Sequence, residues 1–265
     1  MSGYGGSRST LRRDSSNTRF LAERCAPPGA WPYDAGVTVY DIAAQMPSID
    51  VLRQRCKAVA VLDAIIGGDS YTYNRAWGND EAASMRNGSG EEFDIVFTAD
   101  GAFIRGVYHE SSMFTYTGGQ LWPGLLDGLP DEFRSQASEP AFCHMDGTLN
   151  ASFVLWRRAG DERWNAGDDI DFSPADEEEV NPDGSWLLNV LLDDIAGRYI
   201  QYAQDVYEVD LIPPAVEHIV AFLPLTEEVI RALNPEAEPT HVRAKAEEYG
   251  YPLAVGLRRR QRRLT

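Results

Sequence analysis

The sequence predicts an α+β fold in which an antiparallel β-meander sheet packs against one N-terminal helix and a C-terminal set of helices. Two observations support this prediction. Between residues 81 and 108, two turn signals lie so close together that no helix fits between them. After residue 184, the hydrophobic period changes from two to between three and four residues. Segregated strands and helices are typical of α+β domains with an antiparallel sheet.

Two glycine dipeptides define the turns of the predicted meander. Asn87-Gly88 is the strongest hairpin signal in the chain, since both residues tolerate the positive φ of a type I′ turn. Asp100-Gly101 predicts a second tight turn. The predicted strands cover residues 81–86, 93–97, 102–108 and 151–157.

Alternation within the second predicted strand shows which side chains share a face. Phe93, Ile95 and Phe97 recur at every second residue, so they point to one side of the sheet. The sequence therefore predicts a buried face at the centre of the meander.

One helix is predicted before the sheet. Ser48 is a typical N-cap, apolar residues then recur every three or four positions, and Gly67-Gly68 stops the pattern near residue 66. Beyond the meander, helices are predicted to begin near residues 130, 184, 195, 213, 226 and 240.

Composition suggests three regions. Residues 1–36 are rich in Gly, Ser, Arg and Pro, which predicts a disordered or extended segment. Residues 37–254 are predicted to form a single α+β domain, with a boundary near residue 180 as the alternative. Residues 255–265 form a basic tail.

Charge indicates the class of partner. The net charge is −17, and the basic ends 1–20 and 256–265 contribute +3 and +5, which leaves −25 for residues 21–255. Such a body repels nucleic acid, so only the tail from Arg258 to Arg263 is suited to bind it. The partner expected from charge is a basic protein. The sequence does not indicate an oligomeric state.

The chain shows no signs of export or membrane insertion. No apolar run reaches the roughly 20 residues that a membrane span needs, and the N-terminus has no apolar signal region. Cys25, Cys56 and Cys143 are an odd number without metal-binding spacing. We read them as reduced thiols and expect a cytoplasmic protein.

The catalytic candidates are His109, Glu110 and Ser112, at the end of a predicted strand. A metalloprotease helix would need a second histidine at position 113, where the chain has Met113. No nucleophile elbow surrounds Ser112. A hydrolase with a pocket around His109 and Glu110 is therefore the alternative hypothesis, and the absence of catalytic motifs favours a non-catalytic protein.

No metal or cofactor is predicted. The acidic segment 168–183 fails the calcium-loop pattern, because Pro174 and Val180 occupy the required glycine and glutamate positions. Phosphate-binding and dinucleotide fingerprints are absent. Trp77 and Trp122 lie beside turn residues and are the predicted binding residues, because exposed aromatic side chains line ligand pockets and interfaces.

One resemblance extends beyond these motifs. The run SMRNGSG…FTADGAFIRGVYHES, followed by WPGLLDGLPDEF, resembles a pattern in a family of uncharacterised bacterial proteins from actinobacteria and neighbouring groups. It covers roughly residues 46–252. That family has no assigned activity, so the resemblance implies no functional residue. The function expected from the residues is a non-catalytic acidic interaction protein, similar in kind to inhibitors and immunity proteins.

Overall fold

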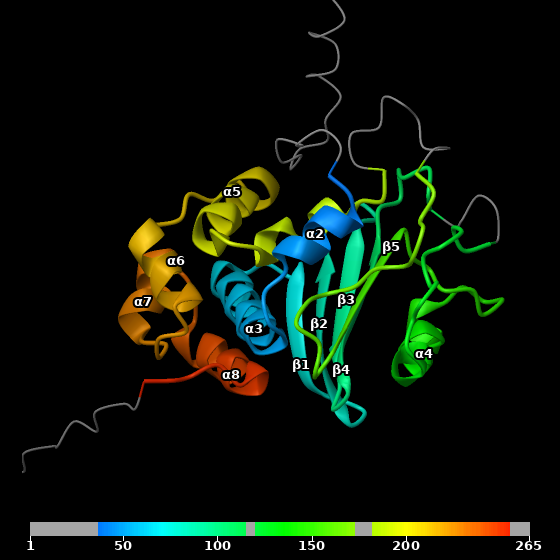
Figure 1. Ribbon diagram of the computed structural model, residues 1–265. Helices are drawn as coiled ribbons and strands as arrows, with labels where there is room; N and C mark the ends of the chain where they lie inside the picture. The colour runs from blue at the N-terminus through cyan, green and yellow to red at the C-terminus, as the bar shows by residue number, and fades with distance from the viewer. Residues whose placement is uncertain (1–36, 115–119, 173–181, 255–265) are drawn as a thin grey trace, which may run out of the picture. The chain divides into compact units, whose positions relative to one another are not determined.

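The computed structural model describes residues 37–114, 120–172 and 182–254, which belong to one compact unit. The α+β prediction is confirmed (Figure 1). The elements are α2 (Val39–Gln45), α3 (Ile49–Ile66), β1 (Tyr71–Trp77), β2 (Asp80–Arg86), β3 (Glu92–Phe97), β4 (Gly101–Val107), η2 (Asp131–Phe133), α4 (Arg134–Ala137), η3 (Pro140–Phe142), β5 (Phe153–Arg158), η4 (Ser185–Leu191), α5 (Ile195–Tyr207), α6 (Pro213–Val220), α7 (Glu227–Leu233) and α8 (Pro239–Tyr249).

The sheet is a five-stranded antiparallel meander in the order β1-β2-β3-β4-β5. The predicted type I′ turn at Asn87-Gly88 is wrong. A five-residue loop, 87–91, joins β2 to β3, and Gly88 has a φ of 80° whereas Asn87 is outside the positive-φ region. The two-residue turn is Gly78-Asn79, which joins β1 to β2. Gly78 has a φ of 62°, which suits a first central residue with left-handed backbone.

Two elements of the structure, α2 and the edge strand β1, were not predicted from the sequence. Tyr71 and Tyr73 alternate with exposed Thr72 and Asn74 as a strand should, but the alternation stops after Asn74. The pairing of β1 with β2 shifts register between Asn74 and Trp77. This irregularity hides the strand pattern in the sequence.

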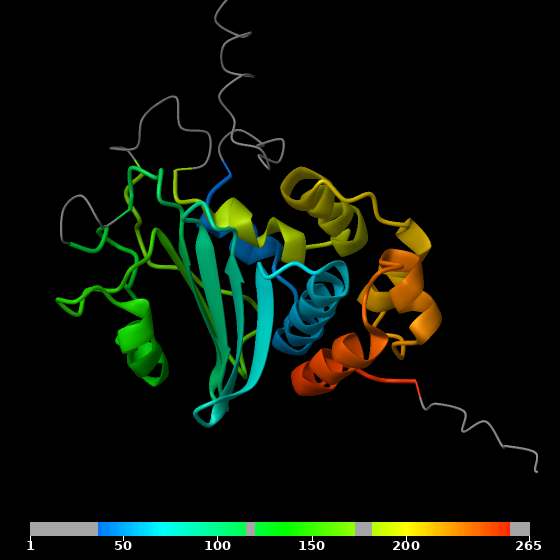
Figure 2. The ribbon, with the colours of Figure 1, turned by 180° about the vertical axis from the view of Figure 1, so that it is seen from behind.

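Helix α3 covers the face of the sheet that carries Phe93, Ile95 and Phe97 (Figures 1 and 2). Its predicted ends are confirmed: the Ser48 side chain accepts a hydrogen bond from Val51 N, and Gly67 is left-handed with a φ of 80°. Nine residues of the helix are buried, so this face forms the main core.

The opposite face of the sheet is covered by the segment that contains η2, α4 and η3 (Figures 1 and 2). A second hydrophobic cluster lies there, in which Phe133 and Phe142 from this segment pack with Val96, Phe103 and Trp156 from the sheet. Both faces of the central strands are therefore buried.

The C-terminal helices pack on α3, and α8 also contacts β1. Helix α7 begins after Thr226 as predicted, with the Thr226 side chain accepting from Val229 N. Helix α8 begins one residue before the predicted Thr240, because Glu238 is its N-cap and Pro239 its first residue.

The predicted domain boundaries stay predictions. Residues 1–36 and 255–265 lie outside the described residues, and so does most of the segment around residue 180. The predicted thiols Cys56 and Cys143 are free, whereas Cys25 lies outside the described residues.

Candidate functional site

Regular alternation along β1 would place Trp77 on the same face of the sheet as Tyr71 and Tyr73, but Trp77 lies on the opposite face. The Asn74 side chain accepts a hydrogen bond from Ala76 N, which turns the backbone where the β1–β2 register shifts. Beyond the shift, Trp77 pairs with Asp80, and residues that pair across a sheet point to the same side. Trp77 thereby packs against the second hydrophobic cluster.

Trp77 lines a pocket of ≈ 440 Å³ between the β1–β2 hairpin and the covering segment. The indole stacks on Phe142, with ring centroids 6.0 Å apart and planes inclined by 1°. Val96 contributes a further apolar wall. Phe142 therefore supports the indole from one side, and Trp77 offers the pocket an aromatic surface of the kind that binds flat or cationic groups.

Two carboxylates lie at this pocket, Asp80 from β2 and Glu139 from the turn before η3. Partial burial, and then the charge of Asp100, raise the pKa of the Asp80 carboxyl. Glu139 Oε1 accepts a hydrogen bond from Ala141 N. Neither carboxylate forms an ion pair with a described residue, and no Lys, Arg or His is among the described residues that line the pocket. The pocket is therefore electronegative.

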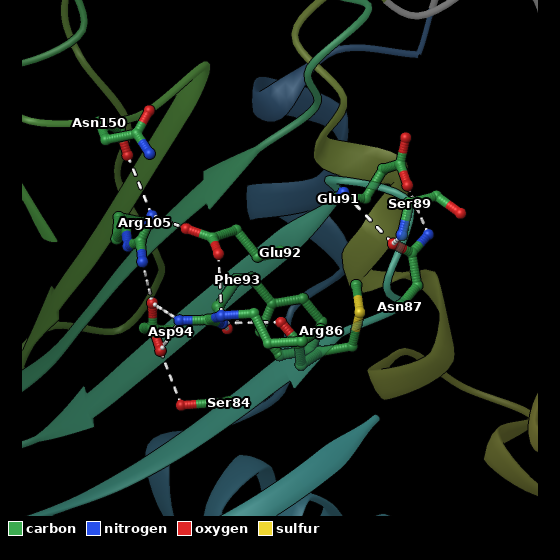
Figure 3. A network of polar contacts seen from close by, with 11 residues as sticks. Ser84, Arg86, Asn87, Ser89, Glu91, Glu92, Phe93, Asp94, Arg105 and Asn150 are labelled. Atoms are coloured by element: carbon green, nitrogen blue, oxygen red, sulfur yellow. Dashed lines mark hydrogen bonds and ion pairs between the residues drawn. The ribbon is translucent and has the colours of Figure 1, made fainter. Parts of the chain in front are cut away.

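A buried arginine supports the pocket from behind. Arg105 lies at the centre of β4, its side chain is 2% exposed, and its Cζ lies 4.9 Å from the centroid of the Phe142 ring. Its Nη1 donates to Glu92 and to Asn150 O, and its Nη2 pairs with Asp94 (Figure 3). These contacts hold Phe142, and with it the stacked Trp77, against the sheet.

Arg86 completes this polar network (Figure 3). Its guanidinium lies 2.8 Å from Glu92 and 2.9 Å from Asp94, and Ser84 Oγ donates to Asp94 at 2.6 Å. Two arginines thus face two carboxylates, so the buried network is electrically neutral and leaves the charge of Asp80 and Glu139 uncompensated.

His109 pairs with Glu91, which the sequence analysis did not select. His109 Nδ1 lies 2.8 Å from Glu91 Oε1, with the imidazole 42% exposed and the glutamate side chain 7% exposed. Asn87 Nδ2 donates to the other oxygen of Glu91 (Figure 3). The loop 87–91 therefore fixes a carboxylate that orients the imidazole.

The other catalytic candidates lie apart from this pair. Glu110 is exposed and accepts a 3.0 Å hydrogen bond from Tyr108 Oη, and Ser112 is exposed. Ser111, which lies between these two residues, is buried. Its hydroxyl donates a hydrogen bond to Pro182 O and accepts one from Met113 N at 2.9 Å. Among the described residues, His109 and Glu110 line neither the Trp77 pocket nor the cavities beside α2 and between α3 and α5.

Trp122 is half-buried and donates from Nε1 to Asp171 O at 2.9 Å, so its polar edge is already satisfied. A larger cavity of ≈ 730 Å³ lies beside α2 and the end of β5. It is lined by charges of both signs, including Arg158, Arg163 and Asp168. Mixed charge gives this cavity no preference for one class of ligand.

Two features are absent from the described residues. No group of three or more His, Cys, Asp or Glu side chains is placed to hold a metal ion. No helix in the described ranges combines the length and hydropathy needed to cross a membrane.

The fold and the pocket define an α+β protein with an electronegative aromatic site. Comparisons find no match to this chain among protein-family models, curated proteins or solved structures. The resemblance to uncharacterised bacterial proteins therefore stays a prediction.

The sequence contained partial signs of this site. Trp77 was selected, and the Gly78-Asn79 turn beside it is a known hairpin signal. Phe142 and Glu139 were missed because only the covering segment's position brings them to the hairpin.

Proposed function

We propose that this chain is a non-catalytic, cytoplasmic binding protein whose partner is a basic protein. The observation that carries the proposal is the Trp77 pocket, where Asp80 and Glu139 remain without ion-pair partners among the described residues. By contrast, the buried carboxylate of Asp94 is neutralised by Arg86 and Arg105.

The charge of the whole chain supports the same proposal. A net charge of −17 attracts a basic protein over distances of about a Debye length and raises the association rate. Inhibitors and immunity proteins bind basic partners in this way, with steering from the overall charge and specificity from a few well-placed groups. Within this chain, the pocket supplies such groups.

Salt-dependent capture tests the proposal. The immobilised chain is incubated with a bacterial lysate at about 50 mM and about 500 mM salt, beside a control protein of the same net charge. We expect one basic protein, absent from the control, to bind with saturation and one-to-one stoichiometry, and to bind more weakly at high salt. If every captured protein also binds the control, the proposal is wrong.

One observation favours the alternative hydrolase. The contact between His109 Nδ1 and Glu91 resembles the carboxylate–imidazole arrangement of a general base, in which the acid fixes the ring and leaves Nε2 to accept a proton. The carboxylate in contact with the imidazole is thus Glu91, and not the predicted candidate Glu110.

Ester hydrolysis separates the two functions. The wild type, His109→Gln and Glu91→Gln are assayed against a panel of p-nitrophenyl esters. A hydrolase should lose about 10²- to 10⁴-fold in rate on loss of its base. The binding protein should show the same background rate in all three variants. Activity that disappears in both variants would establish the alternative.

A further inference from the structure

We infer that the Trp77 pocket binds the guanidinium of an arginine side chain presented by the partner. This inference rests on the proposed function, because it names the group of the basic partner that enters the site. The charge and the shape of the pocket both select this occupant. The shape comes from the parallel rings of Trp77 and Phe142, and the charge comes from the unpaired carboxylates of Asp80 and Glu139.

The aromatic geometry favours a flat cation. Trp77 and Phe142 are parallel within 1°, so a planar group can lie along the indole face without separating the rings. Arg105 already packs its own guanidinium against Phe142 at 4.9 Å, which shows that this ring accepts such a contact. Arginine stacks on aromatic faces more readily than the strongly hydrated lysine ammonium.

The polar groups favour the same ligand. A guanidinium carries five N–H donors, and a carboxylate can accept two of them side by side. Asp80 and the free oxygen of Glu139 provide these acceptors, and the amide of Gln136 also lines the pocket. An anion would meet only like charge here, since no basic side chain is among the described lining residues.

The volume is also appropriate. A pocket of ≈ 440 Å³ lies within the range of ≈ 300–1,000 Å³ that small-ligand sites occupy, so it holds a side chain rather than a folded domain. The rest of the partner would lie over the hairpin and the covering segment, where a buried arginine could act as a central anchor.

Three peptides test the inference without knowledge of the partner. The peptide amides Gly-Arg-Gly, Gly-Lys-Gly and Gly-citrulline-Gly are titrated into the ¹⁵N-labelled full chain, and the indole and backbone N–H resonances are followed by NMR. Citrulline has the shape of arginine without its charge. We expect the arginine peptide to shift the Trp77 resonance with saturation, the lysine peptide to bind at least about fivefold more weakly, and citrulline to have no effect.

Two variants test the location of the site, and a third variant serves as a control. Trp77→Leu and the double variant Asp80→Asn with Glu139→Gln should each weaken arginine binding by about tenfold or more. Trp122→Leu should bind as the wild type does, because Trp122 lies outside the pocket. The melting temperatures of all variants are measured, and the double variant remains informative if Trp77→Leu fails to fold.

The outcomes separate the inference from the proposed function. Equal shifts with arginine and citrulline, or a shift that survives in the double variant, would overturn the inference. If the captured partner binds the double variant normally, the pocket is not its docking point and the inference fails, while the proposed function stands. If the arginine peptide binds but no basic partner is found, the proposed function fails, while the chemistry of the pocket stands.

Discussion

Val39 N donates a 2.6 Å hydrogen bond to Asp183 Oδ2, although the two residues are 144 positions apart in the chain. The second oxygen, Oδ1, accepts from Ser185 N at 2.8 Å, and Asp183 is 0% exposed. One carboxylate therefore joins the first turn of α2 to the start of η4. The sequence predicted only that a helix begins near residue 184.

Asp183→Asn should reduce the free energy of unfolding by about 1–3 kcal/mol. Both carboxylate oxygens accept backbone N–H groups, so an amide would place its own NH₂ against one of these donors and leave it unpaired. Urea denaturation measures the change. Asp131→Asn, at an exposed ion pair, is the control and should change stability by less than about 0.5 kcal/mol. Equal effects would contradict the role of Asp183.

Asp63 should make stability depend on pH. Its Oδ1 accepts from Tyr199 and Tyr207 at 3.0 Å each, and its Oδ2 from Tyr71 N. Burial, only partly offset by these bonds, raises the pKa of Asp63 from its ordinary value of 3.8 to about 6. Because the folded state holds the proton more tightly, its stabilising contribution is full below pH 3.8 and is lost as the pH rises through 6.

The measurement compares the wild type with Asp63→Asn from pH 3.5 to about 7.5. The stability of the wild type minus that of the variant should fall by up to about 3 kcal/mol as the pH rises through this window. The subtraction removes the contribution of Asp183, whose pKa burial also raises to about 6. A difference that stays constant, or increases with pH, would show that folding does not raise the pKa of Asp63.

Arg105→Met should destabilise the fold by about 3–5 kcal/mol, because Arg86 alone then pairs with Glu92 and Asp94, which leaves one negative charge of the network uncompensated. The matched control is Arg158→Met, which removes a surface pair with Glu132 and should cost about 0–1 kcal/mol. Chemical denaturation of both variants decides the matter. Similar losses would mean that the buried network adds nothing to stability.

Gly88→Val should cost about 1–3 kcal/mol. Gly88 has a φ of 80°, which a β-branched residue adopts only with strain. A Cβ added at Gly88 would meet no atom within 4 Å, so a steric clash is not the cause. Gly160→Val is the control, since its surroundings are equally open and its φ is not positive. Thermal melts that fall equally for the two variants would show that conformation at residue 88 is not the cause.

Local patterns in the sequence predicted much of the fold. Ser48 and Gly67 mark the ends of α3, and alternation through Phe93, Ile95 and Phe97 marks β3. These signals depend on neighbours within a few residues, so the chain reveals them without knowledge of distant contacts. The order β2-β3-β4 follows as well, because short connections place these consecutive strands side by side.

The candidate site depended on tertiary structure. Alternation places Asp94 on the face of the sheet opposite Phe93, Ile95 and Phe97. That face would be exposed to water if only one face of the sheet were covered. In the structure, the segment from η2 to η3 covers it, and Asp94 is buried beside Arg105. The partner of His109 is Glu91 rather than its neighbour Glu110, because the five-residue loop brings Glu91 to the end of β4. Such contacts are set by strand register and by which segment covers a face, and both result from long-range packing that no local pattern encodes.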